Sequence, residues 1–265
     1  MRRLPALLAV LTALGAVAQS SADRVRPSAG PPLTKRANEG LVGPVARVHV
    51  RSKLAPRMTP GPSEILAFDR AGNKVSGKEY GADGRLETRF VYTYDAAGNV
   101  VEKRGYDAKG RRTARFTYSY DTKNRRVVVR VYGAKGEAVR HHVMRFDTRG
   151  KVTEFTSYDS HNRQVVRAAC VNDPAGHLVG YTGYSPDGSV SEKASYRYDE
   201  HGGQVEAKVV GPDGSVKSWE KFAYEYDSTG NWLKKTDSRL AGSAGNPRWE
   251  PTWTSYRTIS YYGKR

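Results

Sequence analysis

The residues best suited to chemistry are basic and aromatic side chains that gather between residues 102 and 145. This stretch holds thirteen Lys or Arg and four Asp or Glu. Arginine forks bind carboxylate, sulfate and phosphate groups, and a locally positive surface attracts anionic polymers. We therefore predict an anion-binding surface. Its candidate residues are Arg104, Arg112, Arg115, Tyr118, Arg126, Arg130 and Arg140.

Two other interpretations of this charge stay open. The basic side chains could serve only to keep an exposed sheet in solution. The partner could be a protein rather than an anionic polysaccharide or another envelope polymer. Nucleic acid is less favoured, because the chain has the features of an exported protein and no recognised nucleic-acid-binding fold.

Catalytic and metal-binding patterns are missing from the sequence. The six histidines are scattered, and no G-x-S-x-G, H-E-x-x-H, P-loop or dinucleotide fingerprint occurs. We expect no enzyme activity, no cofactor and no metal site. The single cysteine, Cys170, excludes an intramolecular disulfide and is expected to be a small buried residue rather than a reactive thiol.

An aromatic residue recurs along the chain at spacings that alternate between 12 and 14 residues. Such a period indicates one supersecondary unit repeated many times. Asn172 and Val210 replace the aromatic residue at two positions, and the last step is 16 residues. The aromatic positions are Phe68, Tyr80, Tyr94, Tyr106, Tyr120, Tyr132, Phe146, Tyr158, Tyr184, Tyr198 and Tyr226.

Every second aromatic position is followed by Asp and, three residues after the Asp, by Gly or Asn. This pattern predicts a type I turn closed by a left-handed residue. One carboxylate per turn is too few for calcium, which takes six to eight oxygen ligands. The predicted turn residues are Asp69, Gly72, Asp95, Gly98, Asp121, Asn124, Asp147, Gly150, Asp173, Gly176, Asp199, Gly202, Asp227 and Gly230.

The segments between turns are seven to nine residues long and rich in Val, Thr and Tyr, which predicts strands. We expect an all-β fold, a long antiparallel meander of about fourteen short strands with a 26-residue double unit. If Asp121 pairs with Arg125, all the turn aromatics share one face, and Val127 lies on the other. Neither face is cleanly apolar, so we expect a twisted or curled single-layer sheet, an open β-solenoid, with capping strands at both ends. The four tryptophans, all after residue 218, would plug the open end.

The N-terminus has the pattern of a secretory signal peptide. Two arginines precede an apolar run, and small residues follow near Ala18. We predict a signal peptide at 1–18, a disordered leader at 19–40 and one β-sheet domain at 41–262. The protein would then be exported, periplasmic or secreted, with no transmembrane segment in the mature chain.

The motif Y-D-x-x-G-N at residues 94–99 and 226–231 resembles the repeat of the RHS/YD-repeat family. The chain is similar to small exported bacterial members over residues 44–262. In large members the repeats form a β-shell around a toxin or carry an adhesion surface. The resemblance implies a repeat architecture here, but about fourteen strands are too few for a closed shell.

Together these observations predict a non-catalytic exported repeat protein that binds or scaffolds at the cell envelope. The basic, aromatic-rich surface would hold an anionic glycan or a partner protein. The alternative is a structural or interaction module, or an accessory of an RHS-type toxin or secretion system, that uses its sheet edges or its tryptophans.

Overall fold

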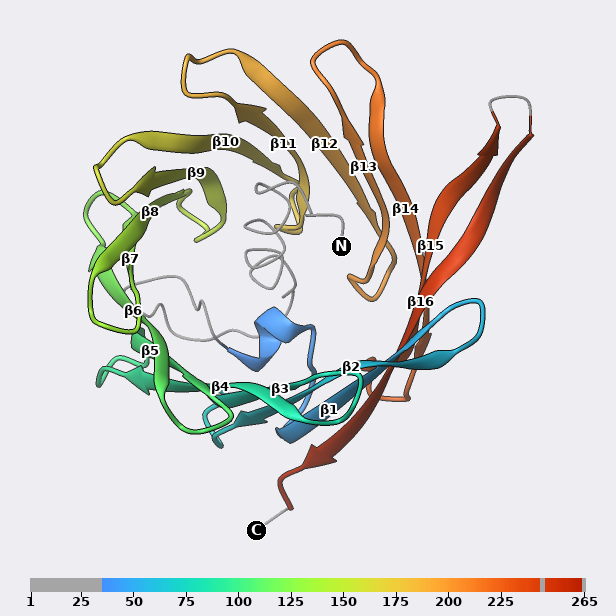
Figure 1. Ribbon diagram of the computed structural model, residues 1–265, viewed down its shortest axis with the longest axis horizontal. Coiled ribbons are helices and arrows are strands. Elements are labelled where there is room, and N and C mark those ends of the chain that lie inside the picture. The colour runs from blue at the N-terminus through green and yellow to red at the C-terminus, as the bar shows by residue number, and fades with distance from the viewer. Residues whose placement is uncertain (1–34, 244–245, 264–265) are drawn as a thin grey trace.

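The protein is a closed antiparallel β-barrel, seen end-on in Figure 1. The computed structural model describes residues 35–243 and 246–263. Within these ranges sixteen strands follow one another around the wall in sequence order, and β16 pairs with β1. The predicted open sheet of about fourteen strands is therefore wrong, and the expectation that the chain is too short to close is wrong with it.

Most strands span seven to twelve residues. Their bounds are β1 (Val45–Leu54), β2 (Thr59–Phe68), β3 (Lys74–Tyr80), β4 (Leu86–Tyr94), β5 (Val100–Asp107), β6 (Arg112–Asp121), β7 (Arg126–Tyr132), β8 (Ala138–Phe146), β9 (Val152–Asp159), β10 (Gln164–Asn172), β11 (Leu178–Tyr184), β12 (Val190–Tyr198), β13 (Gln204–Val210), β14 (Val216–Tyr226), β15 (Trp232–Ser243) and β16 (Asn246–Tyr261).

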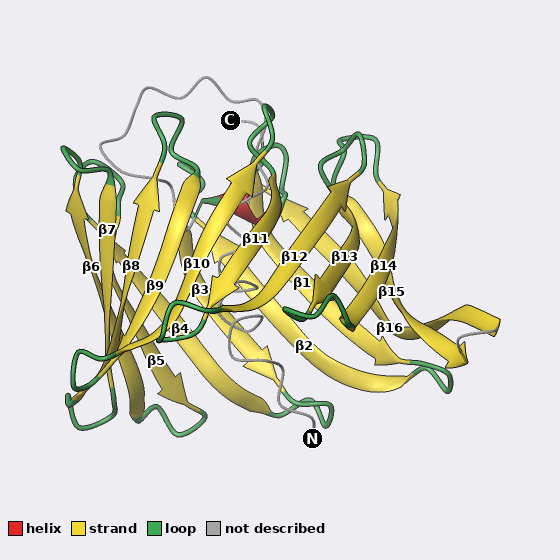
Figure 2. Ribbon diagram, turned by 90° about the horizontal axis from the view of Figure 1, so that it is seen from above, coloured by secondary structure: helices red, strands yellow, loops and turns green. Residues whose placement is uncertain are grey.

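The predicted turns join these strands alternately at the two ends of the barrel (Figure 2). In the turn at residues 95–99, the Gly98 amide donates to the Asp95 carbonyl at 3.0 Å, and Gly98 has a φ of 79°. The Asp95 carboxylate accepts from the backbone amide of Asn99 at 2.8 Å. Gly reaches this left-handed conformation without the steric cost of a Cβ, which explains the Gly in the repeat.

One predicted turn differs in detail. Arg125, not Asn124, has the positive φ, at 47°. Asp121 pairs with Arg126 rather than with Arg125, so the turn holds one residue more than its equivalents. Asn124 instead donates its side-chain amide to the Asp121 carboxylate at 2.8 Å.

A register shift accompanies each of the remaining repeat hairpins. Between β4 and β5, Tyr94 pairs with Val100 but Thr93 pairs with Glu102, so one extra residue is inserted as a β-bulge. Each bulge shifts the pairing and increases the local twist and bend. Repeated along the chain, the shifts supply the strand tilt and curvature that closing a barrel requires.

The bulges also place alternate turn aromatics on opposite faces. Tyr94, like Tyr92 two residues before it, faces the interior, whereas Tyr106 pairs with Arg89 on the outer wall. The prediction that all turn aromatics share one face is therefore wrong. Val127, predicted on the opposite face from the tyrosines, pairs with Tyr120 and is 1% exposed inside the barrel.

The hydroxyl groups of the inward tyrosines donate hydrogen bonds to backbone carbonyls beside the bulges. The Tyr120 hydroxyl donates to the Val100 carbonyl at 2.9 Å. Tyr94, Tyr198 and Tyr224 make the equivalent bond to the residue twenty positions earlier, at 2.7, 2.8 and 3.0 Å. Asn172 makes it with its side-chain amide at 2.8 Å. This bond explains why Asn can replace the aromatic residue at that position.

We expect Tyr120→Phe to lower the free energy of unfolding by about 1–2 kcal/mol, because the buried Val100 carbonyl loses its donor. Urea unfolding would measure the loss. Tyr132→Phe is the matched control, because Tyr132 lies on the outer wall and its hydroxyl has no hydrogen-bond partner in the part of the chain that is described. Equal losses in the two variants would contradict this role for the inward hydroxyls.

Buried apolar clusters line the inner wall. One cluster holds Val127, Val129, Met144, Phe146 and Phe155. Another holds Leu41, Val45, Val48, Leu66 and Phe68. A third is centred on Ala168, Tyr181, Ala194 and Val209.

The first described residues lie inside the barrel. A short 3₁₀ helix, η1 (Arg36–Glu39), sits within the ring of strands in Figure 1. Its Glu39 pairs with Lys74, and the Glu39 carbonyl accepts from Arg257 at 2.9 Å. The end of the predicted leader is therefore ordered. The predicted signal peptide and the leader up to residue 34 lie outside the described residues.

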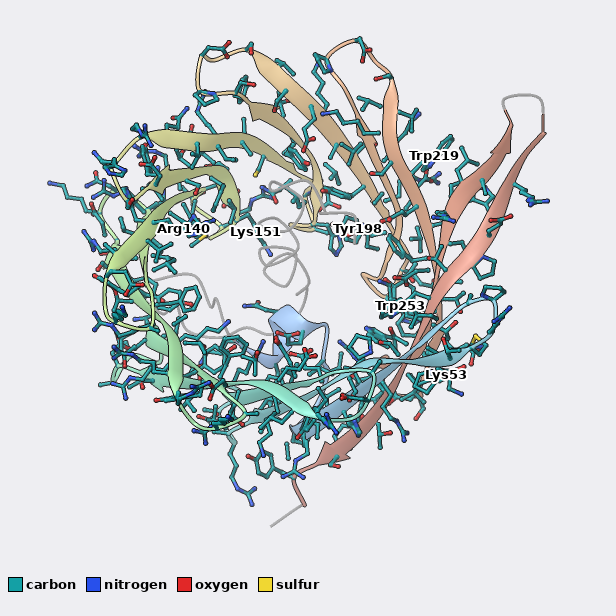
Figure 3. The ribbon with its side chains drawn as sticks, in the orientation of Figure 1. Lys53, Arg140, Lys151, Tyr198, Trp219 and Trp253 are labelled. Atoms are coloured by element: carbon teal, nitrogen blue, oxygen red, sulfur yellow. The ribbon has the colours of Figure 1, made fainter. Side chains whose placement is uncertain are left out.

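The predicted caps and tryptophan plug take a different form. β1 and β16 pair with each other, so neither is a free cap. Trp219 lies on the outer wall (Figure 3), edge-to-face with Trp249, with ring centroids 5.5 Å apart. Trp253 lies on the inner side, where it pairs with Leu54. Because the barrel closes by strand pairing, it needs no aromatic plug.

Candidate functional site

A row of cation–aromatic pairs runs along the outer wall. Arg89 on β4 pairs with Tyr106 on β5, and its guanidinium lies 4.9 Å from the ring centroid. The same pair recurs as Arg115 on Tyr132 at 4.3 Å and Arg167 on Tyr184 at 5.0 Å. Between them the His141 ring stacks on Tyr158, with ring centroids 4.6 Å apart. We call these eight residues the stacked row.

The repeat positions the stacked row. Residues 89, 115, 141 and 167 are each 26 residues apart and occupy the same place in successive double units, on β4, β6, β8 and β10. The partner tyrosines are the outward turn aromatics. A cation over a tyrosine ring gains about 0.5–1 kcal/mol at an exposed site. The stacking therefore holds each side chain against the wall.

Further cations flank the row on the preceding strands. Lys78 lies opposite Arg89, Arg104 lies opposite Arg115, and Arg130 lies opposite His141. The equivalent residue beside Arg167 is Thr156. Positive charge is thus densest from β3 to β8.

Carboxylates neutralise only part of this charge. Glu102 pairs with Arg104 at 2.5 Å and lies 3.7 Å from Arg115, and Glu154 pairs with Arg167 at 3.0 Å. No carboxylate among the described residues lies within 4.0 Å of Arg89 or Arg130. These two side chains keep their donors available for an external anion.

His141 occupies a position where the other three double units of the row carry a permanent cation. Its ring lies between Arg130 and Tyr158, and is stacked on Tyr158 at an interplanar angle of 7°. Burial, and then the charge of Arg130, lower the pKa of His141 below its ordinary value. The row therefore has one member whose charge depends on pH.

The seven residues predicted from the sequence do not form one surface. Arg104, Arg115 and Arg130 lie on the outer wall in or beside the stacked row. Arg112, bonded to the Ala134 carbonyl at 3.2 Å, and Arg140, opposite Asp159, lie at one end of the barrel.

The other two candidates are further from the row. Arg126 lies at the opposite end, 3.8 Å from Asp121. Tyr118 faces the interior and packs on the cluster that contains Val129. The anion-binding surface predicted from the sequence did not include the stacked residues Arg89, Tyr106, His141 and Arg167. The 26-residue spacing could have identified them.

Charged side chains on the inner wall contact aromatic rings. Arg257 lies over Trp232, with 3.7 Å from the guanidinium to the ring centroid, and burial lowers its pKa to about 10. Lys103 lies 3.8 Å from the Phe90 ring centroid, and burial lowers its pKa. The pair of Glu39 with Lys74 and the bond from Arg257 to the Glu39 carbonyl tie η1 to the wall, while Nε and Nη1 of Arg257 are buried without a hydrogen-bond partner among the described residues.

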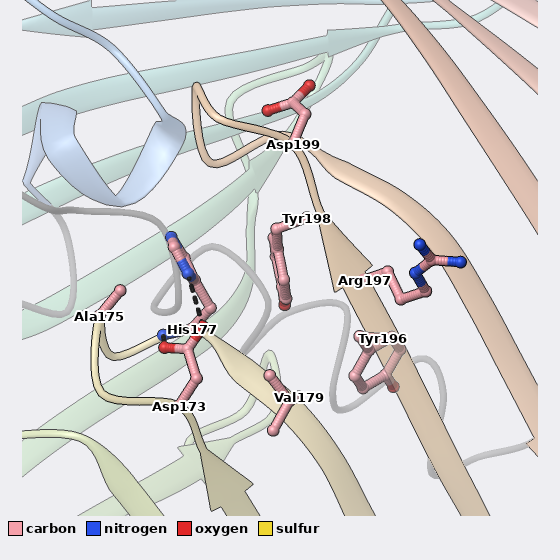
Figure 4. Close-up of a pocket in the computed structure, with 8 residues that line it drawn as sticks. All are labelled: Asp173, Ala175, His177, Val179, Tyr196, Arg197, Tyr198 and Asp199. Carbon is pink, nitrogen blue, oxygen red and sulfur yellow. Dashed lines mark hydrogen bonds and ion pairs between the residues drawn. The ribbon is translucent and has the colours of Figure 1, made fainter.

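A pocket of about 410 Å³ lies between β11 and β12. His177 stacks on Tyr198 at 4.6 Å between ring centroids and bonds to Asp173 at 3.1 Å (Figure 4). Asp199, also at the pocket, accepts from Tyr226 at 2.7 Å. The polar groups of this pocket are therefore engaged in turn structure.

The remaining candidates for chemistry are few. No group of three His, Cys, Asp or Glu side chains in residues 35–243 and 246–263 is placed to hold a metal ion. Burial, and then Glu154, raise the pKa of the Cys170 thiol to about 12.

No helix of the described chain is long and apolar enough to cross a membrane.

Comparisons with known proteins give only distant likenesses. No family model matches the sequence, and no curated protein matches it. A porin-like protein from Bacteroides uniformis is 11% identical, with a TM-score of 0.40, over 83% of this chain and 98% of that one. The TcdB2-TccC3 structure is 11% identical, with a TM-score of 0.23, over 72% of this chain and 14% of that one. The YD-repeat resemblance therefore stays a prediction from the motif.

Proposed function

We propose that the protein is a non-catalytic, exported binding protein of the bacterial cell envelope that holds an anionic polymer against the stacked row. The observation that carries this proposal is the repetition of one arginine–tyrosine pair at the same place in three of four successive double units, with a histidine stacked on the tyrosine in the other. A repeated site suits a repeated ligand, because each unit of a polymer can make the same contact.

The exposed cations on the outer wall, Arg89 of the row and three neighbours of the row, support a ligand that approaches from water. Each lysine or arginine facing lipid at a bilayer midplane would cost about 2–4 kcal/mol. Lys78, Arg89, Arg104 and Arg130 lie on the outer wall and are largely exposed. The outer wall thus favours contact with water and with a hydrated polyanion.

The stacked arginines are expected to carry the binding. We expect the triple variant Arg89→Ser, Arg115→Ser and Arg167→Ser to weaken binding to an acidic polysaccharide about tenfold to a hundredfold. The slope of log Kd against log salt concentration should decrease by about one for each arginine removed. Equilibrium binding in increasing salt, with lipopolysaccharide, an acidic glycan and DNA as ligands, measures both.

A second triple variant controls for net charge. Arg111, Arg149 and Arg163 pair with the aspartates of their own turns, at 2.7, 3.1 and 2.8 Å. Replacing all three with Ser removes the same charge but leaves the row intact. If this variant loses as much affinity as the first, binding reflects overall charge and the proposed site is wrong.

His141 makes the proposed binding depend on pH. We expect affinity for the polymer to rise about threefold to tenfold as the pH falls from 8 to 5, because protonation adds a cation to the row. His141→Arg should bind tightly at both pH values, and His141→Gln weakly at both. His161→Gln, at an exposed turn, is the control. A pH dependence that survives in His141→Gln would exclude His141 as its source.

The alternative of a module that assembles through free sheet edges is not supported, because β1 pairs with both β2 and β16. Closure removes the free edges that would template such assembly. A protein partner at Trp219 and Trp249 remains the second candidate. It predicts binding that is insensitive to salt and unchanged in the Arg89, Arg115 and Arg167 variant.

A further inference from the structure

A glutamate lies between two opposed cations at one place in the stacked row. Arg104 and Arg115 lie directly opposite each other on β5 and β6. Glu102, two residues before Arg104 on β5, lies diagonal to Arg115 and contacts both arginines, at 2.5 and 3.7 Å. Long side chains reach such diagonal neighbours on the same face of a sheet. The outer wall therefore contains a carboxylate that bridges two arginines on neighbouring strands.

This glutamate recurs in every second double unit. Glu154 contacts Arg167 at 3.0 Å, and Glu206 accepts from the indole Nε1 of Trp219 at 2.7 Å. Both occupy the place of Glu102, because the three glutamates are 52 residues apart and each lies thirteen residues before its partner. In the double units between them the same place holds a residue without charge: Ser76, Val128 or Gly180. We call these three positions the open places.

Of the open places, only the one beside Ser76 has a permanent cation on both strands. Lys78 and Arg89 lie directly opposite each other on β3 and β4, in the arrangement that Glu102 bridges on β5 and β6. Both are exposed, and neither has a carboxylate within 4.0 Å in the part of the chain that the structure describes. Like charges directly opposite each other destabilise a sheet. A carboxylate supplied from outside would relieve this repulsion.

Resting on the proposed function, we propose that Ser76, Lys78 and Arg89 form a binding site for a carboxylate group of the polymer, such as that of a uronic acid sugar. The carboxylate lies between Lys78 and Arg89, as the Glu102 carboxylate lies between its two arginines. The short Ser76 side chain cannot reach this position itself. Row members that already hold a glutamate add to the positive potential of the wall without contacting the acidic groups of the polymer.

Placing a carboxylate in the site tests this inference. The probe is hexagalacturonate, and its Kd is measured at pH 7 and low salt. Ser76→Glu should weaken binding about threefold to tenfold, because the new carboxylate pairs with Lys78 and Arg89 and competes with the probe. Glu102→Gln should tighten binding about threefold, because it frees the neighbouring pair of arginines for a carboxylate of the probe.

Two control variants separate the site from size and net charge. Ser76→Gln adds a side chain of the same size without the charge. Ser228→Glu adds the same charge on the exposed turn between β14 and β15. Each should change Kd by less than about twofold, because salt screens exposed charges that lie more than a Debye length apart.

Two further measurements follow the carboxylate itself. Ser76→Glu should be more stable to urea than Ser76→Gln, because its carboxylate relieves the repulsion between Lys78 and Arg89. In ¹H–¹⁵N spectra, the Arg89 Nε–H signal, assigned with Arg89→Lys, should shift when the probe is added to the wild-type protein. The same addition to Ser76→Glu should leave that signal in place.

The outcomes separate the site from the function beneath it. Equal losses of affinity in Ser76→Glu and Ser228→Glu would overturn the site while polyanion binding stands. An unmoved Arg89 signal in wild-type protein that binds the probe would do the same. Binding of dextran sulfate but not of hexagalacturonate would overturn the choice of a carboxylate. If the wild-type protein binds no anionic polymer, both the site and the proposed function are overturned.

Discussion

Replacing Asn231 with Ala is expected to lower the free energy of unfolding by about 3–4 kcal/mol. Asn231 is 0% exposed. Its side-chain oxygen Oδ1 accepts from the Val42 amide at 2.7 Å, and its side-chain nitrogen Nδ2 donates to the Val42 carbonyl at 3.1 Å and to the Tyr261 hydroxyl at 2.9 Å. The Ala variant leaves the Val42 backbone groups without these partners, at about 1–3 kcal/mol for each group that stays buried.

Asn99 offers a matched control for this substitution. It occupies the equivalent turn position after Asp95 and is 8% exposed, but among the described residues its side chain bonds only to the Asp95 carboxylate, at 3.0 Å. We expect Asn99→Ala to cost about 1 kcal/mol. Urea unfolding of both variants measures the difference. Equal losses would mean that Asn231 acts only within its own turn and does not hold the N-terminal segment to the barrel.

Replacing Glu64 with Gln is expected to stabilise the protein at high pH. Burial is the main cause that raises the pKa of Glu64 to about 7, and the nearby charge of Glu39 adds to it, followed by Glu79. Lys74 and Arg257 act in the opposite direction. The folded protein therefore holds the Glu64 proton to a higher pH than the unfolded chain does.

The sign of the pH dependence follows from this shift. Because the unfolded pKa is 4.5 and the folded pKa is about 7, ionisation of Glu64 destabilises the fold progressively between these values, and the penalty is complete above pH 7. The Gln variant removes a penalty of about 2–3 kcal/mol at pH 8 and changes little near pH 4.

Thermal or urea unfolding of Glu64→Gln at pH 4, 6 and 8 checks this expectation. Glu87→Gln, at an exposed position, is the control and should have no pH-dependent effect. A stabilisation by Glu64→Gln that is the same at all three pH values would show that the variant repacks the interior rather than removes a buried charge.

The turns were the part of the fold that the sequence predicted best. Asp and Gly at fixed spacing are needed by the turn itself, so their local chemistry is readable without knowledge of the rest of the molecule. Gly98, Gly150 and Gly230 all have the positive φ that the pattern implies. Arg125 escaped prediction because the extra residue in its turn moved the left-handed position by one.

Closure of the barrel escaped prediction for a related reason. The bulges, such as the one at Tyr94 and Val100, add one residue to a strand without any distinctive residue type. Since each bulge reverses which face the following residues occupy, missing them also put the outward and inward tyrosines on one face.

The candidate site was predicted only in part for the same reason. Of the residues that composition suggested, Arg104, Arg115 and Arg130 lie on one wall. It could not separate them from Tyr118, which faces the interior. Stacking of Arg89 and Arg167 on the outward tyrosines depends on the register, which composition does not contain.

The central claim, that the outward tyrosines and not the inward ones line the binding surface, can be tested by NMR of fluorotyrosine-labelled protein titrated with an acidic polysaccharide. Resonances would be assigned by single Tyr→Phe variants. Signals of Tyr106, Tyr132, Tyr158 and Tyr184 should shift in proportion to the bound fraction, while those of Tyr120, Tyr198 and Tyr224 should stay unchanged. Shifts confined to the inward set, or binding that leaves the outward set unmoved, would contradict the account.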